Sequence, residues 1–193
     1  MTMTVEIYED SGTAVAGRGT TRIAVENIGW KSSGLDESNS YIYNPITRSE
    51  TDVVWSFTKY NFMKISGTYA AGARPRIEIR GNVAGAPPAG YDGTTKVKLY
   101  YKLTNEYITP SAAMDGSLIY LPPGVTTLYP KLSTVGPEDA TSSYVQHLTG
   151  NATYFSQYLV TQLLVEPGTA FDYGNLGELI IKVFVDEYET TDY

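Results

Sequence analysis

The sequence of 193 residues contains no cysteine and a single histidine, His147. Without cysteine the chain forms no disulfides and offers no thiolate for catalysis or metal binding, a composition that fits a protein made in a reducing cytoplasm. A catalytic triad needs a base and a zinc site usually draws on His or Cys, so either site would depend on His147 alone. A surface or capping histidine is the simpler interpretation.

Long apolar runs and basic clusters are also lacking. No run approaches the roughly 20 apolar residues of a membrane span, and the start MTMT lacks the basic and apolar regions of a signal peptide. We therefore expect a soluble protein that is not bound to a membrane and not exported by a cleaved signal. Lys and Arg total 14 against 21 Asp and Glu, a net charge of −7, and no Lys/Arg cluster exceeds two residues. This balance disfavours direct binding to nucleic acid.

Tyrosine, in contrast, is abundant, with 17 residues against two tryptophans. Tyrosine suits half-buried strand faces, the cores of protein interfaces and platforms that stack on sugars. Composition alone leaves these three uses open.

The most sustained apolar and β-branched segments are residues 152–165 and 178–185. Alternate residues sort by face, and one face of each segment is apolar. The apolar faces are Phe155, Leu159, Leu163 and Val165 in the first segment, and Leu179, Ile181, Val183 and Val185 in the second. This is the period of a strand with a face to bury.

Shorter strand-like segments are separated by turn signals. They comprise residues 2–8, 21–30, 41–43, 52–59, 62–69, 75–80, 96–103, 117–121 and 126–130. Segments 52–59 and 62–69 predict a hairpin or one long bulged strand, and segment 75–80 places Ile77 and Ile79 inward. No amphipathic helix of ten residues is present, and one helical turn is expected near Pro137. The pattern predicts an all-β fold, an antiparallel β-sandwich or jelly roll with long irregular loops and possible terminal arms.

Three regions are predicted along the chain. Residues 1–20 are expected to form an N-terminal strand and a flexible connection, because residues 9–20 contain three glycines and no periodic face. Residues 21–189 form a single β-sandwich domain, and residues 190–193 an acidic tail. The N-terminal strand is either the first strand of its own domain, which we favour, or an arm that pairs with the sheet edge of a neighbouring subunit. The irregular stretch 104–151 suggests binding loops or assembly contacts.

Loop acids are the remaining catalytic candidates, since a sandwich can bring two carboxylates to the separation that glycoside hydrolysis requires. The acids to consider are Asp115, Glu138, Asp139 and Asp172. Isolated loop acids are more often turn formers, so we expect no enzyme and assign no catalytic residue. Asp172 and Glu178 could help to hold a hard cation, but no calcium-loop pattern is present, and we assign no metal or cofactor site.

Three further patterns are given structural interpretations. Gly17-Arg18-Gly19 lacks the third glycine and the helix of a phosphate-binding loop, so a turn or linker is expected. Asn151-Ala152-Thr153 matches a glycosylation triplet, which carries no weight without a secretion signal. Several tyrosines could form a sugar platform, although core edges and subunit contacts are the more common use. These are Tyr91, Tyr100, Tyr120, Tyr144 and Tyr173.

Four blocks of the chain carry a family resemblance. They are GTTRIAVENIGWKSSG, KYNFMKISGTYAAGARPRIEIRG, KVKLYYKLTNEY and QYLVTQLLVEPGTAFDYGNLGELIIKVFVDEYE. In texture, from residue 21 to residue 189, the chain resembles the small β-rich virion structural proteins of tailed bacteriophages. The blocks contain no catalytic signature.

The resemblance implies a structural part of a virion, assembled in the host cytoplasm. Its partners would be other virion proteins and copies of itself in a symmetric oligomer, with no nucleic acid and no membrane. We favour a neck, tail or baseplate component over a capsid decoration protein, with a fibre or adaptor module as a third placement. The competing class is a carbohydrate-binding or receptor-binding sandwich module, and an enzyme comes third.

Overall fold

The computed structural model describes residues 3–25, 30, 46, 49–69, 73–80, 97–122, 124–141, 148, 150–168 and 180–186. In this part of the chain every paired strand is antiparallel, and the only helical element is the single turn η2 (Pro137–Asp139). The predicted all-β, sandwich-like fold is confirmed, as is the helical turn at Pro137. The segment 41–43 and the tail 190–193 lie outside the described residues.

The larger sheet has nine strands. Its main path follows the order β2-β1-β4-β11-β6-β7, with β3, β9 and β10 as short additions. The strands are β1 (Met3–Val15), β2 (Arg18–Ala24), β3 (Val54–Trp55), β4 (Lys59–Gly67), β6 (Val97–Thr104), β7 (Ile119–Tyr120), β9 (Leu132–Ser133), β10 (Tyr154–Ser156) and β11 (Tyr158–Val165).

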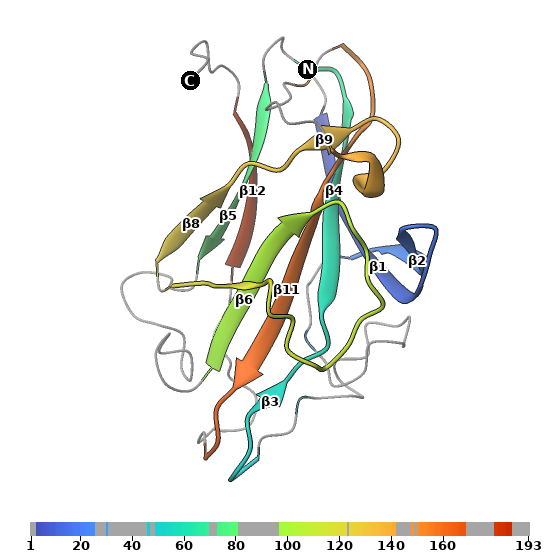
Figure 1. Cartoon of the computed structure of the whole chain (residues 1–193). Coiled ribbons are helices and arrows are strands. Elements are labelled where there is room, and N and C mark those ends of the chain that lie inside the picture. Colours follow the sequence, from blue (N-terminus) through green and yellow to red (C-terminus); the bar gives the residue numbers. More distant parts are fainter. Residues whose placement is uncertain are drawn as a thin grey trace.

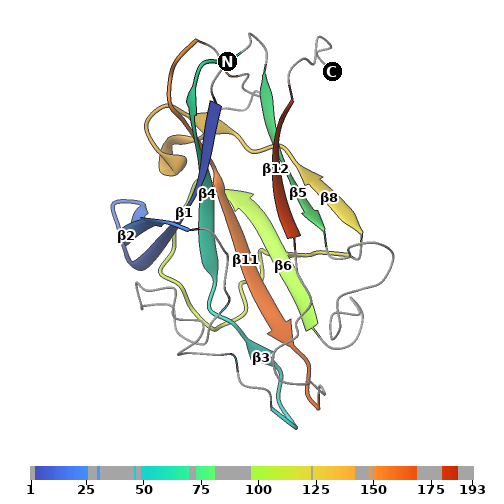
Figure 2. The same ribbon diagram turned by 180° about the vertical axis from the view of Figure 1, so that it is seen from behind.

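The smaller sheet has three strands in the order β12-β5-β8. They are β5 (Arg74–Arg80), β8 (Val125–Leu128) and β12 (Ile180–Asp186), and they lie side by side next to the larger sheet in both views (Figures 1 and 2). Ile77 and Ile79 of β5, predicted to point inward, are 3% and 0% exposed. They pack in the main core against Met63 of β4, Leu99 of β6 and Leu163 of β11.

The opposite face of the larger sheet is covered by the protein's own irregular chain. Because strand residues alternate between faces, Tyr60, Tyr158 and Val160 point away from the main core. They form a second cluster with Tyr107 and Leu118, which come from the stretch between β6 and β7. The central strand β11 is therefore buried along its whole length.

This double burial corrects the one-faced strand predicted for residues 152–165. Leu159 and Leu163 do lie in the main core, but Phe155 packs with the second cluster instead. The strand is interrupted at Gln157, whose backbone N–H and side-chain carbonyl both bond to the main chain of Lys131. This interruption shifts the alternation by one residue, so β10 and β11 are separate strands.

Segments 52–59 and 62–69 are one interrupted strand rather than a hairpin. β3 and β4 both pair antiparallel with β11, β3 at Leu164 and Val165 and β4 at residues 159–161. Between them Ser56 exchanges hydrogen bonds with the main chain of Leu163, which keeps the break in line with β11.

The flexible connection predicted for residues 9–20 is wrong. β1 continues through this stretch to Val15 and turns directly into β2. The strand pairs with β4 from Met3 to Asp10, so the N-terminal strand belongs to the sheet of its own chain. This hairpin projects from the edge of the larger sheet in both views (Figures 1 and 2).

Candidate functional site

The projecting end of the β1–β2 hairpin is built by local backbone geometry. Val15 pairs with Arg18, which leaves Ala16 and Gly17 as a two-residue loop with φ values of 49° and 79°. Positive φ at both positions is the type I′ turn that matches the twist of two strands. The register shifts between Ser11 and Ala14, where Gly12 has φ 81°. The sequence predicts a turn or linker for Gly17-Arg18-Gly19; Gly17 lies in this turn, whereas Arg18 and Gly19 begin β2.

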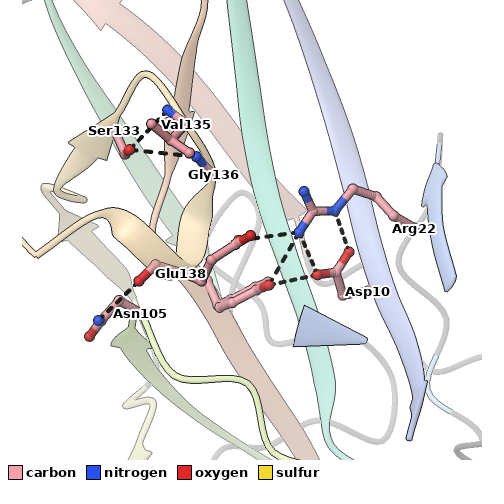
Figure 3. A network of polar contacts seen from close by, with 8 residues as sticks. Asp10, Arg22, Asn105, Ser133, Val135, Gly136 and Glu138 are labelled. Carbon is pink, nitrogen blue, oxygen red and sulfur yellow. Dashed lines mark hydrogen bonds and ion pairs between the residues drawn. The ribbon is translucent and has the colours of Figure 1, made fainter. Parts of the chain in front are cut away.

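A partly buried ionic network fixes this hairpin to the body of the protein (Figure 3). The Asp10 side chain is fully buried and accepts two hydrogen bonds from Arg22, at 2.7 and 2.8 Å. The hydroxyl of Tyr158 in β11 donates to the same carboxylate at 2.6 Å. Arg22 also lies 3.4 Å from Glu138 of η2 and 4.7 Å from the ring centroid of Phe62. We call the β1–β2 unit held by these contacts the anchored hairpin.

Electrostatics keep two members of this network, Arg22 and Tyr158, protonated. The hydrogen bonds from Arg22 to Asp10 raise the pKa of the guanidinium further above its usual value, although burial opposes the shift. Burial raises the pKa of Tyr158, and its hydrogen bond to Asp10 adds to the effect. Both groups hold their protons firmly, so the network is suited to holding structure rather than to moving protons.

The neighbouring acid Glu9 points to the other face of β1, as strand alternation requires. It pairs with Lys59 of β4 at 2.6 Å, and both side chains are 7% exposed. Two more contacts bind the hairpin to the segment after β6: Tyr107 donates to the carbonyl of Gly12 at 2.7 Å, and Thr109 accepts from the N–H of Ala14 at 2.8 Å. Polar contacts on both faces thus hold the anchored hairpin in one position.

The outer end of the anchored hairpin is left exposed. Residues 15–18 are all exposed, and Val15 keeps 55% of its surface accessible. The arrangement therefore presents a short, rigidly held tip with an apolar side chain.

A group of aromatic side chains lies on the same face of the larger sheet as the second cluster. It lies next to the stretch between β6 and β7, which covers the rest of this face. Trp55 of β3 and Tyr100 of β6 have ring centroids 5.2 Å apart, and Tyr100 and Tyr120 of β7 are 5.8 Å apart. All three side chains are half-buried. We call these three residues the aromatic row. Lys98 of β6 forms an ion pair of 2.7 Å with Glu166, which directly follows β11.

The buried side-chain amide of Gln162 in β11 binds the main chain of the stretch between β6 and β7. Its side-chain nitrogen donates to the carbonyls of Ser56 and Ala113, at 2.9 and 3.0 Å, and its oxygen accepts from the N–H of Asp115. Gln162 pairs with Tyr100 in the register, so the stretch between β6 and β7 extends as far as the Gln162–Tyr100 pair.

The loop acids in the described chain take structural roles. Asp115 accepts hydrogen bonds from Ser117 within a turn and from Lys102 of β6. Burial acts to raise the pKa of Asp115, but these hydrogen bonds outweigh it and lower the pKa below its usual value. Glu138 pairs with Arg22, whereas Asp139 is exposed beside it in η2. Asp115 and Glu138 thus serve turn formation and anchoring.

Several candidates fall outside the described residues. They are His147, Asp172, Glu178, Tyr91, Tyr144 and Tyr173. Among the residues that are described, no group of three or more His, Cys, Asp or Glu side chains is placed to hold a metal ion. The described part of the chain also contains no helix long and apolar enough to cross a membrane.

Sequence reasoning named Glu138 of the ionic network as a loop acid but missed Asp10, Arg22 and Tyr158. Asp10 and Arg22 fell in the predicted flexible connection or at its border, and Tyr158 was not considered at all. The available signal was a run of two acids inside a strand-like N-terminus, with an arginine placed symmetrically across a possible Ala-Gly turn. The aromatic row was predicted in part, since Tyr100 and Tyr120 were platform candidates and Trp55 was not.

No family model matches the chain, and the searches found no similar curated protein and no similar solved structure.

Proposed function

We propose that the chain is a structural component of a bacteriophage virion that makes protein–protein contacts in the neck, tail or baseplate. The partners would be other virion proteins and copies of the chain itself. The sequence resemblance over residues 21–189 motivates the proposal, and the all-β sandwich-like fold is compatible with it.

The observation that carries the proposal is the anchored hairpin. Its tip exposes Val15, while the Arg22–Asp10 and Lys59–Glu9 ion pairs and the Tyr158 hydroxyl hold its base. An interface loses less conformational entropy when the contacting element is already rigid. A rigid hairpin with an exposed apolar tip is therefore suited to insertion between neighbouring proteins of an assembly.

Immunogold electron microscopy tests the location directly. Antibodies raised against the purified chain would be applied to tailed particles released from the strain that carries the gene. Label at the neck, tail or baseplate is the expected result. Label over the capsid surface would instead support a decoration protein, and unlabelled particles that contain no peptides of this chain would overturn the virion assignment.

The Val15→Asp variant tests the contact element. The charge lies on an exposed tip, so folding should be retained while incorporation into particles or self-association falls at least tenfold. Val135→Asp, at a side chain that is 73% exposed in the loop before η2, is the matched control. Equal incorporation of both variants would show that the hairpin tip makes no essential contact.

A further inference from the structure

We propose that the aromatic row is a binding site for a neutral oligosaccharide. This inference goes beyond the structural role proposed above and depends on a different face of the molecule. Sugar rings present apolar C–H faces that pack on aromatic rings, and hydroxyls around their rims that require hydrogen-bonding partners. A site for them needs both kinds of group close together.

The strand register brings both kinds of group to one face of the sheet. Leu164 of β11 pairs with Trp55 on one side and with Lys98 on the other. Two residues further along β6 from Lys98, Tyr100 pairs with Tyr120 of β7. Directly opposite residues share a face, and so do residues two apart, so the three aromatic rings and Lys98 lie on the same side.

Hydrogen-bonding groups remain available in this patch. Within the described residues, the indole N–H of Trp55 and the hydroxyl of Tyr100 take part in no hydrogen bond, and neither is a buried atom. Lys98 and Glu166 side chains are 23% and 26% exposed, so the rim of their ion pair is reachable from solvent. The hydrogen bond to Glu166 raises the pKa of Lys98, which keeps the amine charged.

The charges and ring planes define the ligand class. Lys98 forms an ion pair with Glu166, so its amine is engaged by a carboxylate and is not free to attract a sulfated or carboxylated glycan. The planes of Trp55 and Tyr100 are inclined by 58°, and those of Tyr100 and Tyr120 by 55°. Such inclined rings do not form a flat surface and fit a short, twisted sugar chain rather than a crystalline polysaccharide.

Fluorescence gives a selective readout because the chain has two tryptophans, Trp30 and Trp55. In a Trp30→Phe background, Trp55 is the only indole and reports ligand binding at the aromatic row. The purified variant would first be screened on a glycan array and then titrated with maltohexaose, cellohexaose, xylohexaose and chitohexaose. We expect binding to at least one neutral glycan, with a saturable change in Trp55 emission.

Two further variants locate the site. Tyr100→Ala should weaken glycan binding at least tenfold. Lys98→Met should also weaken glycan binding, and it should affect folding less than Tyr100→Ala does. Tyr129→Ala, at a tyrosine that is 43% exposed after β8, should bind like the background protein. Thermal unfolding of each variant separates lost binding from lost structure.

Three outcomes would overturn the inference. They are no binding to any neutral glycan on the array, binding that prefers acidic glycans, and binding that is unchanged in both Tyr100→Ala and Lys98→Met. Because the virion location is tested on particles and this site on the purified chain, either proposal can fail without the other.

Discussion

At the scale of single residues, the most informative group is the hydroxyl of Tyr158. It donates to the Asp10 carboxylate at 2.6 Å from a side chain that is 0% exposed. Tyr158→Phe keeps the aromatic packing and removes this one donor. Because hydrogen bonds to charged groups contribute about 1.5–3 kcal/mol, we expect the free energy of unfolding to fall by that amount.

Urea unfolding of Tyr158→Phe against the unchanged protein measures this loss. Tyr129→Phe is the control, since it removes a hydroxyl from an exposed tyrosine whose ring still packs on Arg74. Equal unfolding midpoints for the two variants would show that the Asp10 network adds nothing to stability.

Ala16 offers a stabilising substitution. It is the only residue other than glycine with positive φ in the described chain, at 49°. The left-handed region costs about 1–2 kcal/mol for most residues, whereas asparagine tolerates it and Asn-Gly is the preferred type I′ pair. We expect Ala16→Asn to stabilise the protein by about 0.5–1 kcal/mol, and Ala16→Val to destabilise it. Thermal unfolding checks both, and a lower melting temperature for Ala16→Asn would contradict the turn assignment.

These residues show where sequence reasoning stopped. Asp10 and Gly12 have low intrinsic strand propensity, and Ala-Gly is a weaker turn signal than Asn-Gly, so the stretch predicted a flexible connection. Pairing with β4 and the Tyr158 contact override these local preferences. Such partners are distant in sequence, and no local sequence pattern predicts them.

At the scale of elements, the tyrosines of the second cluster predict that the folded protein loses stability at alkaline pH. Burial raises the pKa of Tyr60 from 10.0 to about 12, with a backbone hydrogen bond to Ile108 opposing the shift. Burial also raises the pKa values of Tyr107 and Tyr158. The folded protein therefore keeps protons that the unfolded chain releases, so stability is complete below pH 10 and falls as the pH rises toward about 12.

Urea midpoints measured from neutral pH to about pH 11 test this dependence, with tyrosinate absorbance as a second readout. Tyr60→Phe removes one titrating group and should make the decline shallower. A decline of the same steepness in that variant would show that Tyr60 does not titrate with unfolding.

The strands themselves were largely predictable, because their apolar residues alternate. The inward positions Ile77 and Ile79 and the strand between 96 and 103 agree with β5 and β6. The face opposite the main core was not predicted. β11 needs a cover on both sides, and the cover is the irregular stretch containing Tyr107 and Leu118, which has no periodic signal of its own.

At the scale of the whole molecule, strand order was beyond sequence reasoning. Neighbours in the larger sheet come from distant parts of the chain, as with β4 beside β11, and pairing depends on register rather than on local propensity. The candidate site followed the same rule: Tyr100 and Tyr120 were recognisable as aromatics of interest, but only the register places Trp55 and Lys98 beside them.

A deletion of the N-terminal strand distinguishes a strand that stabilises its own domain from an arm that is exchanged between subunits. β1 pairs with β4 in its own chain, adds Val5 and Ile7 to the main core, and supplies Glu9 to the buried amine of Lys59.

Deleting residues 1–24 should therefore abolish cooperative unfolding or lower the melting temperature by many degrees, because an unpaired buried charge and an open sheet edge remain. Circular dichroism during heating measures this effect. Adding the separate peptide 1–24 should restore part of the stability, since it can pair again with the open edge of β4. An exchanged arm predicts the opposite result, a truncated chain that melts like the full protein and differs only in self-association by light scattering.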